Sequence, residues 1–280
     1  MKGTAMAAAL TAVLLGASAC TSASQDRPEG GSRTTPAAAS AASLDALRAA
    51  EKATERAGSA KMRSLTVMGT QMSLKADGAL DWKGDLTGAM TITYTGGTVA
   101  RTMRQMGVTT MRARYLADAY YAHMGDTFAA RIGGRHWLRY AYEDLKNVGA
   151  GADLADQMRR TTPDESVKLL LDSKDVHETG TETVDGRTAT HYSGTVLVAD
   201  VSDGELREQL RQAGVTSETV DVWIDEEDLL VKKVEKSRTA SGNLTQTARY
   251  SDYGVRVSVR KPPASDTEDF KKLLGTQNGS

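Results

Sequence analysis

An alternation of apolar and polar residues with a period of two is the feature that most constrains this fold. In residues 86–95 every second position is apolar or small and the positions between them are mostly threonine: Leu86, Gly88, Met90, Ile92 and Tyr94. This pattern is typical of an antiparallel strand with one face buried and the other in water. The same period returns over much of residues 61–124 and 175–260, so the sequence predicts a domain built mainly from antiparallel strands.

The period-two stretches and the turn signals between them give a series of expected strands. Asp185-Gly186 favours a two-residue type I′ turn, and Pro262-Pro263 ends the series because proline donates no hydrogen bond to a ladder. The expected strands are Met62–Leu74, Leu86–Tyr94, Thr110–Leu116, Ala119–Met124, His136–Tyr140, Asp175–Val184, Arg187–Val198, Val220–Asp225, Leu229–Thr239, Leu244–Tyr253 and Val255–Arg260.

Helical spacing and capping residues predict a few helices. An amphipathic helix is expected after Ser43 as N-cap, ending at Gly58, and capping boxes begin at Thr162 and Ser202. Shorter helices are expected at Asp153–Arg159 and from Ser265 to Leu274. The stretch Gly96–Val108 is interpreted as a long loop, with a lid as the alternative.

The N-terminal segment has the form of an export signal. Lys2 precedes an uncharged apolar run, Ala5–Leu15, and small residues 16–19 lead to Cys20, the only cysteine of the chain. A helix across a bilayer needs about 20 residues, so this run is too short to be a transmembrane anchor. Small residues before a cysteine resemble the lipobox of bacterial lipoproteins, which implies lipidation of Cys20 by acyl chains such as palmitate. The alternative is secretory cleavage near Ala19 that leaves Cys20 as a free thiol.

These signals divide the chain into four segments. Residues 1–19 are expected to form the lipoprotein signal peptide, and residues 20–42 a flexible tether that begins at lipidated Cys20, because they are rich in Ala, Ser, Thr, Pro and Gly. The root-mean-square reach of such a tether is about 25 Å. The folded domain is expected at 43–275 and a disordered tail at 276–280.

Composition excludes several classes of function. The whole chain has 35 basic and 36 acidic residues; without Lys2 the balance is 34 against 36, which gives no support for a nucleic-acid partner. Motifs for nucleophilic catalysis, for phosphate or dinucleotide binding and for zinc are missing from the sequence. The four histidines have no ligand spacing, and Asp225–Asp228 is interpreted as a solvated turn rather than a calcium loop. We therefore expect no catalytic residue, no metal and no cofactor.

A group of arginines stands out in the region from Gly96 to Tyr140. These side chains either meet anionic headgroups at a membrane or form the wet faces of strands. The second interpretation is the simpler one, because the overall charge is close to zero. The residues are Arg101, Arg104, Arg112, Arg114, Arg131, Arg135 and Arg139.

Three segments behind the lipobox resemble the actinobacterial lipoproteins of the LppX/LprA/LprF/LprG group. They are VDGRTATHYSGTV (184–196), VDVWIDEEDLLVKK (220–233) and YSDYGVRVSVRKPP (250–263), and the resemblance extends over Ser43–Phe270. It implies an α+β, LolA-like fold: a curved antiparallel sheet, or half-barrel, covered on its concave face by helices. It also implies a hydrophobic cavity for a lipid or glycolipid.

Five apolar residues on expected strands are candidates for the lining of that cavity: Met68, Met72, Met90, Ile92 and Tyr94. The face that carries them either packs on the helices or lines the cavity. We expect a lipid-anchored monomer at the extracytoplasmic face of the cell membrane that binds or carries lipid. The alternative is an envelope interaction or sensor module with the same fold and a filled interior. An apolar cavity of several hundred Å³ would favour the first function.

Overall fold

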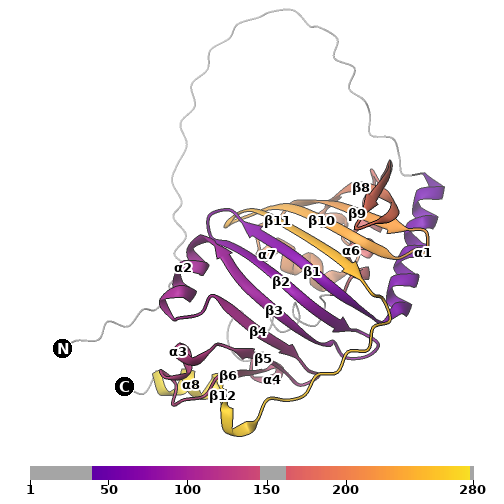
Figure 1. The fold of residues 1–280 in the computed structure, drawn as a ribbon. Coiled ribbons are helices and arrows are strands. Elements are labelled where there is room, and N and C mark those ends of the chain that lie inside the picture. The colour runs from indigo at the N-terminus through magenta and orange to yellow at the C-terminus, as the bar shows by residue number, and fades with distance from the viewer. Residues whose placement is uncertain (1–39, 146–161, 278–280) are drawn as a thin grey trace, which may run out of the picture. The chain divides into compact units, whose positions relative to one another are not determined.

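The computed structural model describes residues 40–145 and 162–277, which belong to one compact unit, Pro36–Ser280. Twelve strands form a single open sheet in the order β12-β6-β5-β4-β3-β2-β1-β11-β10-β9-β8-β7 (Figure 1). The strands are β1 (Ser59–Met68), β2 (Met72–Asp81), β3 (Thr87–Gly96), β4 (Thr110–Tyr115), β5 (Ala119–His123), β6 (Trp137–Ala141), β7 (His177–Val184), β8 (Arg187–Leu197), β9 (Ser217–Asp225), β10 (Leu230–Thr239), β11 (Gly242–Ser251) and β12 (Thr267–Asp269).

The described helices are few and mostly short: α1 (Ala41–Ala57), α2 (Gly97–Gln105), α3 (Asp126–Ala129), α4 (Tyr142–Leu145), α6 (Asp164–Leu171), α7 (Gly204–Gln212) and α8 (Phe270–Gln277). Two 3₁₀ turns, η1 (Val198–Asp200) and η2 (Ala264–Asp266), complete the elements. Within the described residues no helix is long and apolar enough to cross a membrane.

Neighbouring strands are antiparallel throughout the sheet except at one edge, where β12 runs parallel to β6. The two halves of the chain meet in the middle of the sheet, because β1 pairs with both β2 and β11. Met62 lies opposite Tyr250 on one side and opposite Gly78 on the other. The predicted α+β fold with an open, curved antiparallel sheet is confirmed.

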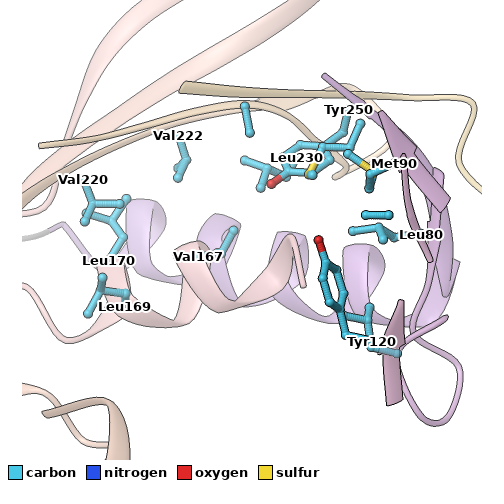
Figure 2. Close-up of a cluster of buried hydrophobic side chains, with 14 of the residues drawn as sticks. Leu80, Met90, Tyr120, Val167, Leu169, Leu170, Val220, Val222, Leu230 and Tyr250 are labelled. Carbon is cyan, nitrogen blue, oxygen red and sulfur yellow. The ribbon is translucent and has the colours of Figure 1, made fainter. Parts of the chain in front are cut away.

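Helices α1 and α6 cover the concave face of the sheet. Leu47 of α1 and Leu170 of α6 are fully buried in the core. Figure 2 shows Val167 and Leu170 beneath Val220 and Val222 of β9. Burying each such aliphatic side chain contributes about 1.5–3 kcal/mol relative to exposure, so this layer supplies much of the stability of the domain.

The ends of α1 show how local sequence sets an element. The hydroxyl of Ser40 accepts a hydrogen bond from the Ser43 N–H, so the N-cap lies three residues before the predicted one. Gly58 ends the helix with φ 69°, as predicted, because glycine tolerates the left-handed region. At the other end of the domain, α8 continues to Gln277, two residues past the predicted boundary at 275.

Several expected elements differ in the structure. The stretch Met62–Leu74 forms two strands, because the chain turns at residues 69–71, where Gly69 has φ 47°. Residues 96–108 are not a loop: they contain helix α2, in which Ala100 is fully buried and Met103 packs against the core. The hairpin turn at Asp185-Gly186 is confirmed, with φ 49° and 84°.

The C-terminal part also differs. Residues 255–260 form no strand; the segment runs along the sheet and is held by side chains, with Ser59 donating to the Val255 carbonyl and Arg114 to the Arg260 carbonyl. The helix expected from Ser265 begins only at Phe270, because η2 and β12 occupy residues 264–269.

Two other helix starts differ from the prediction. Asp203 rather than Ser202 caps α7, and its carboxylate accepts from the N–H groups of Glu205 and Leu206. Helix α6 follows Pro163 without a side-chain cap, so the box predicted at Thr162 does not form. The helix expected at Asp153–Arg159 lies outside the described residues.

Candidate functional site

The concave face of the sheet carries a group of neighbouring apolar side chains at the end where β1 turns into β2. Met68 lies opposite Met72 across the β1–β2 pair, and Leu74 lies opposite Tyr94 across the β2–β3 pair. Ile92 precedes Tyr94 by two residues in β3 and therefore lies on the same face. All five are partly exposed, and two of them, Ile92 and Tyr94, also pack against the core. We call these five residues, Met68, Met72, Leu74, Ile92 and Tyr94, the apolar end.

Met90, the remaining candidate, lies deeper on the same face and is 4% exposed. It sits opposite Gly78, and a Cβ on that glycine would lie 2.7 Å from the Met90 sulfur. The methionine therefore fills the space that a side chain at position 78 would take. Figure 2 shows Met90 beside Leu80, Tyr250 and Leu230 in the packed core.

Tyr94 of the apolar end and two further tyrosines, Tyr115 and Tyr140, pack against the same core. The Tyr94 hydroxyl donates to the Met111 sulfur at 3.8 Å, and burial raises the pKa of Tyr94 above its ordinary value. Burial raises the pKa of Tyr115 and of Tyr140 to about 12. These phenols stay neutral at physiological pH, so the region presents ring faces and hydroxyl groups rather than charge.

A cluster of polar residues occupies the other half of the concave face, over β9 and β10. The Lys233 ammonium donates to the Ser166 hydroxyl of α6 at 2.7 Å and to both carboxylate oxygens of Glu235, at 3.0 and 3.1 Å. Glu218 and Ser237 lie directly opposite each other across the β9–β10 pair. We call these five residues, Ser166, Glu218, Lys233, Glu235 and Ser237, the polar cluster.

The polar cluster is buried. Glu218 is 7% exposed, Lys233 8% and Ser237 9%, and the Ser237 hydroxyl finds no hydrogen-bond partner among the described residues. Burial, reinforced by the nearby Glu235 carboxylate and opposed by Lys233, raises the pKa of Glu218 from 4.5 to about 7. The folded protein therefore holds this proton more tightly than the unfolded chain. Its contribution to stability is full below about pH 4.5 and is lost as the pH rises toward 7.

A groove of about 380 Å³ runs along the outer side of α6. It lies between α6, α1 and the start of α7, and its lining mixes acidic, basic and aliphatic side chains. The lining residues are Glu51, Glu165, Lys168, Leu169, Leu171, Asp172, Val201, Ser202, Asp203 and Leu206. None of the five candidate residues lines this groove.

The histidines take structural places on the strands and their connections. His123 and His136 stack with ring centroids 5.7 Å apart, and His191 stacks on Trp223 at 4.0 Å. In the part of the chain that the structure describes, no group of three or more His, Cys, Asp or Glu residues is placed to hold a metal. Asp225 accepts from the N–H groups of Glu227 and Leu229, which makes it a turn-forming residue.

The expected arginines divide into two groups. Arg139 pairs with Asp269 at 2.9 Å, and Arg114 lies 4.4 Å from the centroid of the Trp137 ring. Arg101, Arg104 and Arg131 are exposed and form no ion pair with any described carboxylate. Cys20, the predicted lipidation site, lies outside the described residues.

Sequence reasoning missed the polar cluster. The sequence feature that could have indicated the polar cluster is the alternation of Lys233 and Glu235 with Val234 in β10. This alternation predicts one charged face of the strand, but it does not say whether that face points to the core or to solvent. A bulge between Leu230 and Lys232 shifts the register, so Val231 and Lys233 fall on opposite faces. Lys233 thereby points to the concave side, opposite α6.

No family model matches the chain. Among solved structures, LprF from Mycobacterium bovis is similar with a TM-score of 0.53 and 15% identity over 81% of this chain and 100% of that one. LppX from Mycobacterium tuberculosis is similar with a TM-score of 0.50 and 17% identity over 78% of this chain and 98% of that one. The chain therefore has the same fold as LprF and LppX.

Two bacterial sequences are much closer. A Streptomyces coelicolor protein named "putative lipoprotein" is 58% identical over 237 residues, 84% of this chain and 78% of that protein. An uncharacterised 31.2 kDa protein of Streptomyces griseus, from the rplA-rplJ intergenic region, is 47% identical over 247 residues, 84% of this chain and 81% of that protein. The chain belongs to this family of actinobacterial lipoproteins.

Proposed function

We propose that this protein binds or carries a lipid on the concave face of its sheet, while Cys20 anchors it to the extracytoplasmic side of the cell membrane. The observation that carries the proposal is the apolar end. Its five apolar side chains lie on neighbouring strands and all keep part of their surface accessible, and contiguous accessible apolar surface marks binding sites more often than single apolar residues do. Met68, Met72, Ile92 and Tyr94 would line the site, and Met90 would form its floor.

The composition of the apolar end suits acyl chains. Methionine side chains are flexible and polarisable, so they adapt to ligands of varied shape. Met103 and Met106 extend the same set from α2 and the turn after it, where they pack against the core. No catalytic step is needed for such a function, and the nearby tyrosines are held neutral by burial.

Lipid analysis of the purified protein tests the proposal. The Cys20→Ser chain avoids the covalent lipid, and mass spectrometry of an organic extract then detects only lipid held by the fold. We expect an acyl lipid in near-stoichiometric amount. A lipid-free chain that also takes up no fatty acid or phospholipid on incubation would contradict the proposal.

The second candidate is an interaction or sensor module with a filled interior. The specific observation in its favour is the packed layer between α6 and β9, which includes the polar cluster rather than an open acyl pocket. This candidate predicts a lipid-free chain that still binds a protein of the envelope, so the same lipid analysis separates the two.

A further inference from the structure

Helix α2 and the short α3 meet at one corner of the domain, where three cationic side chains face solvent. Arg101 and Arg104 are one turn apart on α2, on the same side of the helix. Arg131 follows α3 and donates to the carbonyl of Gln105, the last residue of α2, at 3.1 Å. The three guanidinium groups therefore gather on one surface, which we call the α2–α3 corner.

The charge of this corner is not balanced within the described part of the chain. Arg101 donates to the Thr98 hydroxyl, a neutral acceptor, and none of the three arginines forms an ion pair with a described carboxylate. Asp126 is the only acidic residue of α2, α3 and the residues that directly follow each helix. Its carboxylate lies 3.4 Å from a ring nitrogen of His136.

The α2–α3 corner adjoins the apolar end. The N–H groups of Thr98 and Val99 at the start of α2 donate to the carbonyls of Thr70 and Gln71, in the turn that joins Met68 to Met72. Figure 1 shows α2 at this end of β2 and β3, with α3 nearby. Cationic side chains thus stand at the rim of the surface that we propose for lipid.

We infer that the α2–α3 corner is the surface by which the domain docks on an anionic membrane, with the three guanidinium groups meeting lipid phosphates. Each Lys or Arg near an anionic bilayer surface contributes about fivefold to binding, and the effect fades within a Debye length. Guanidinium groups bind phosphate through two parallel hydrogen bonds, which adds to this attraction. Docking at this corner would place the apolar end next to the bilayer.

Vesicle sedimentation with the Cys20→Ser chain tests the inference, because this chain lacks the covalent anchor. We expect it to sediment with phosphatidylglycerol-containing vesicles at low salt, to be released at high salt, and to ignore pure phosphatidylcholine vesicles. Changing Arg101, Arg104 and Arg131 together to glutamine should weaken binding by about a hundredfold. The corresponding triple lysine variant keeps the charge and should retain most of the binding.

The control removes the same charge at the opposite end of the sheet. Three exposed residues surround the start of β1: Arg56, Lys83 and Arg256. The Lys83 side chain lies beside Gly58, which Arg56 precedes by two residues. Arg256 follows Gly254, whose N–H donates to the Ser59 carbonyl. Their triple glutamine variant should bind vesicles like the parent chain. Equal loss in both glutamine variants, retained binding in the corner variant, or no binding of the parent would overturn the inference. A lipid that still co-purifies in any of these cases leaves the proposed function standing.

Discussion

Tryptophan substitutions at Met90 and Ile92 separate the packed part of the concave face from the part proposed to hold lipid. Met90 is 4% exposed, and its sulfur would lie 2.7 Å from a Cβ at Gly78, so no room exists even for one methyl group there. Met90→Trp should therefore lower the free energy of unfolding by about 1–3 kcal/mol, the usual cost of overpacking. In a domain of this size that corresponds to a decrease in Tm of about 3–10 °C.

Ile92 is partly exposed on the same strand and the same face, two residues farther toward the apolar end. Ile92→Trp should change Tm by no more than about 2 °C, because Ile92 is only partly buried and the larger ring can extend toward Tyr94 and Leu74, which are also partly exposed. It should also lower the amount of lipid that co-purifies with the Cys20→Ser chain, because it occupies the proposed site. Thermal melting by circular dichroism and mass spectrometry of the lipid extract measure the two effects on the same samples.

Two results would refute this reasoning. A Met90→Trp chain that melts like its parent would mean that the space around Met90 is open. An Ile92→Trp chain with a large loss of stability would mean that the apolar end is filled by the protein itself. A parent chain without lipid would leave the packing comparison valid and count against the lipid proposal alone.

Three further predictions concern other parts of the chain. The parent chain should lose at most about 3 kcal/mol of unfolding free energy between about pH 4.5 and 7, as Glu218 gives up its proton, and Glu218→Gln should abolish this loss. Urea unfolding across this pH range measures the effect, with Glu227→Gln as the exposed control. A Glu218→Gln chain with the pH profile of the parent would contradict the raised pKa of Glu218. Cys20→Ser should release the protein from the membrane fraction, because the variant lacks the two acyl chains of a diacyl anchor, and it should leave Tm unchanged. A variant that stays in the membrane fraction after a salt wash would refute lipidation of Cys20. Thr54→Val should cost about 1–3 kcal/mol in urea unfolding, because the buried Leu230 N–H loses its 3.2 Å bond to the threonine hydroxyl; a cost near zero would show that this N–H finds another partner.

The strands were the most predictable part of the fold, because their alternation is a local property of the sequence. Val220, Val222 and Ile224 were expected on one face of a strand, and all three are buried in the core. The turn at Asp185-Gly186 followed from the positive φ angles that this dipeptide tolerates. These features depend on neighbours in sequence, which the chain itself displays.

Features that depend on distant parts of the chain were not predictable. β12 has three residues and pairs in parallel with β6, an arrangement for which Thr267–Asp269 carries no pattern of its own. Helix α2 was missed although Val99 and Met103 have helical spacing, because the two glycines at 96–97 and the polar residues between suggested a loop. The register of β1, β2 and β3 places the candidate lining residues on one face, but their exposure depends on where α1 and α6 lie, which no strand pattern contains.

The pairing of β1 with β11 also sets an order of assembly. β1 is among the first elements to leave the ribosome and β11 among the last, so the edge of β1 has no partner until nearly the whole chain is available. Pairing between such distant segments is slow, commonly in the range of milliseconds to seconds. An unpaired edge of this kind invites pairing with other chains, and the exposed Lys61 and Arg63 on β1 oppose it. Replacing these charges by apolar residues would therefore harm the yield of folded protein more than the stability of the finished domain.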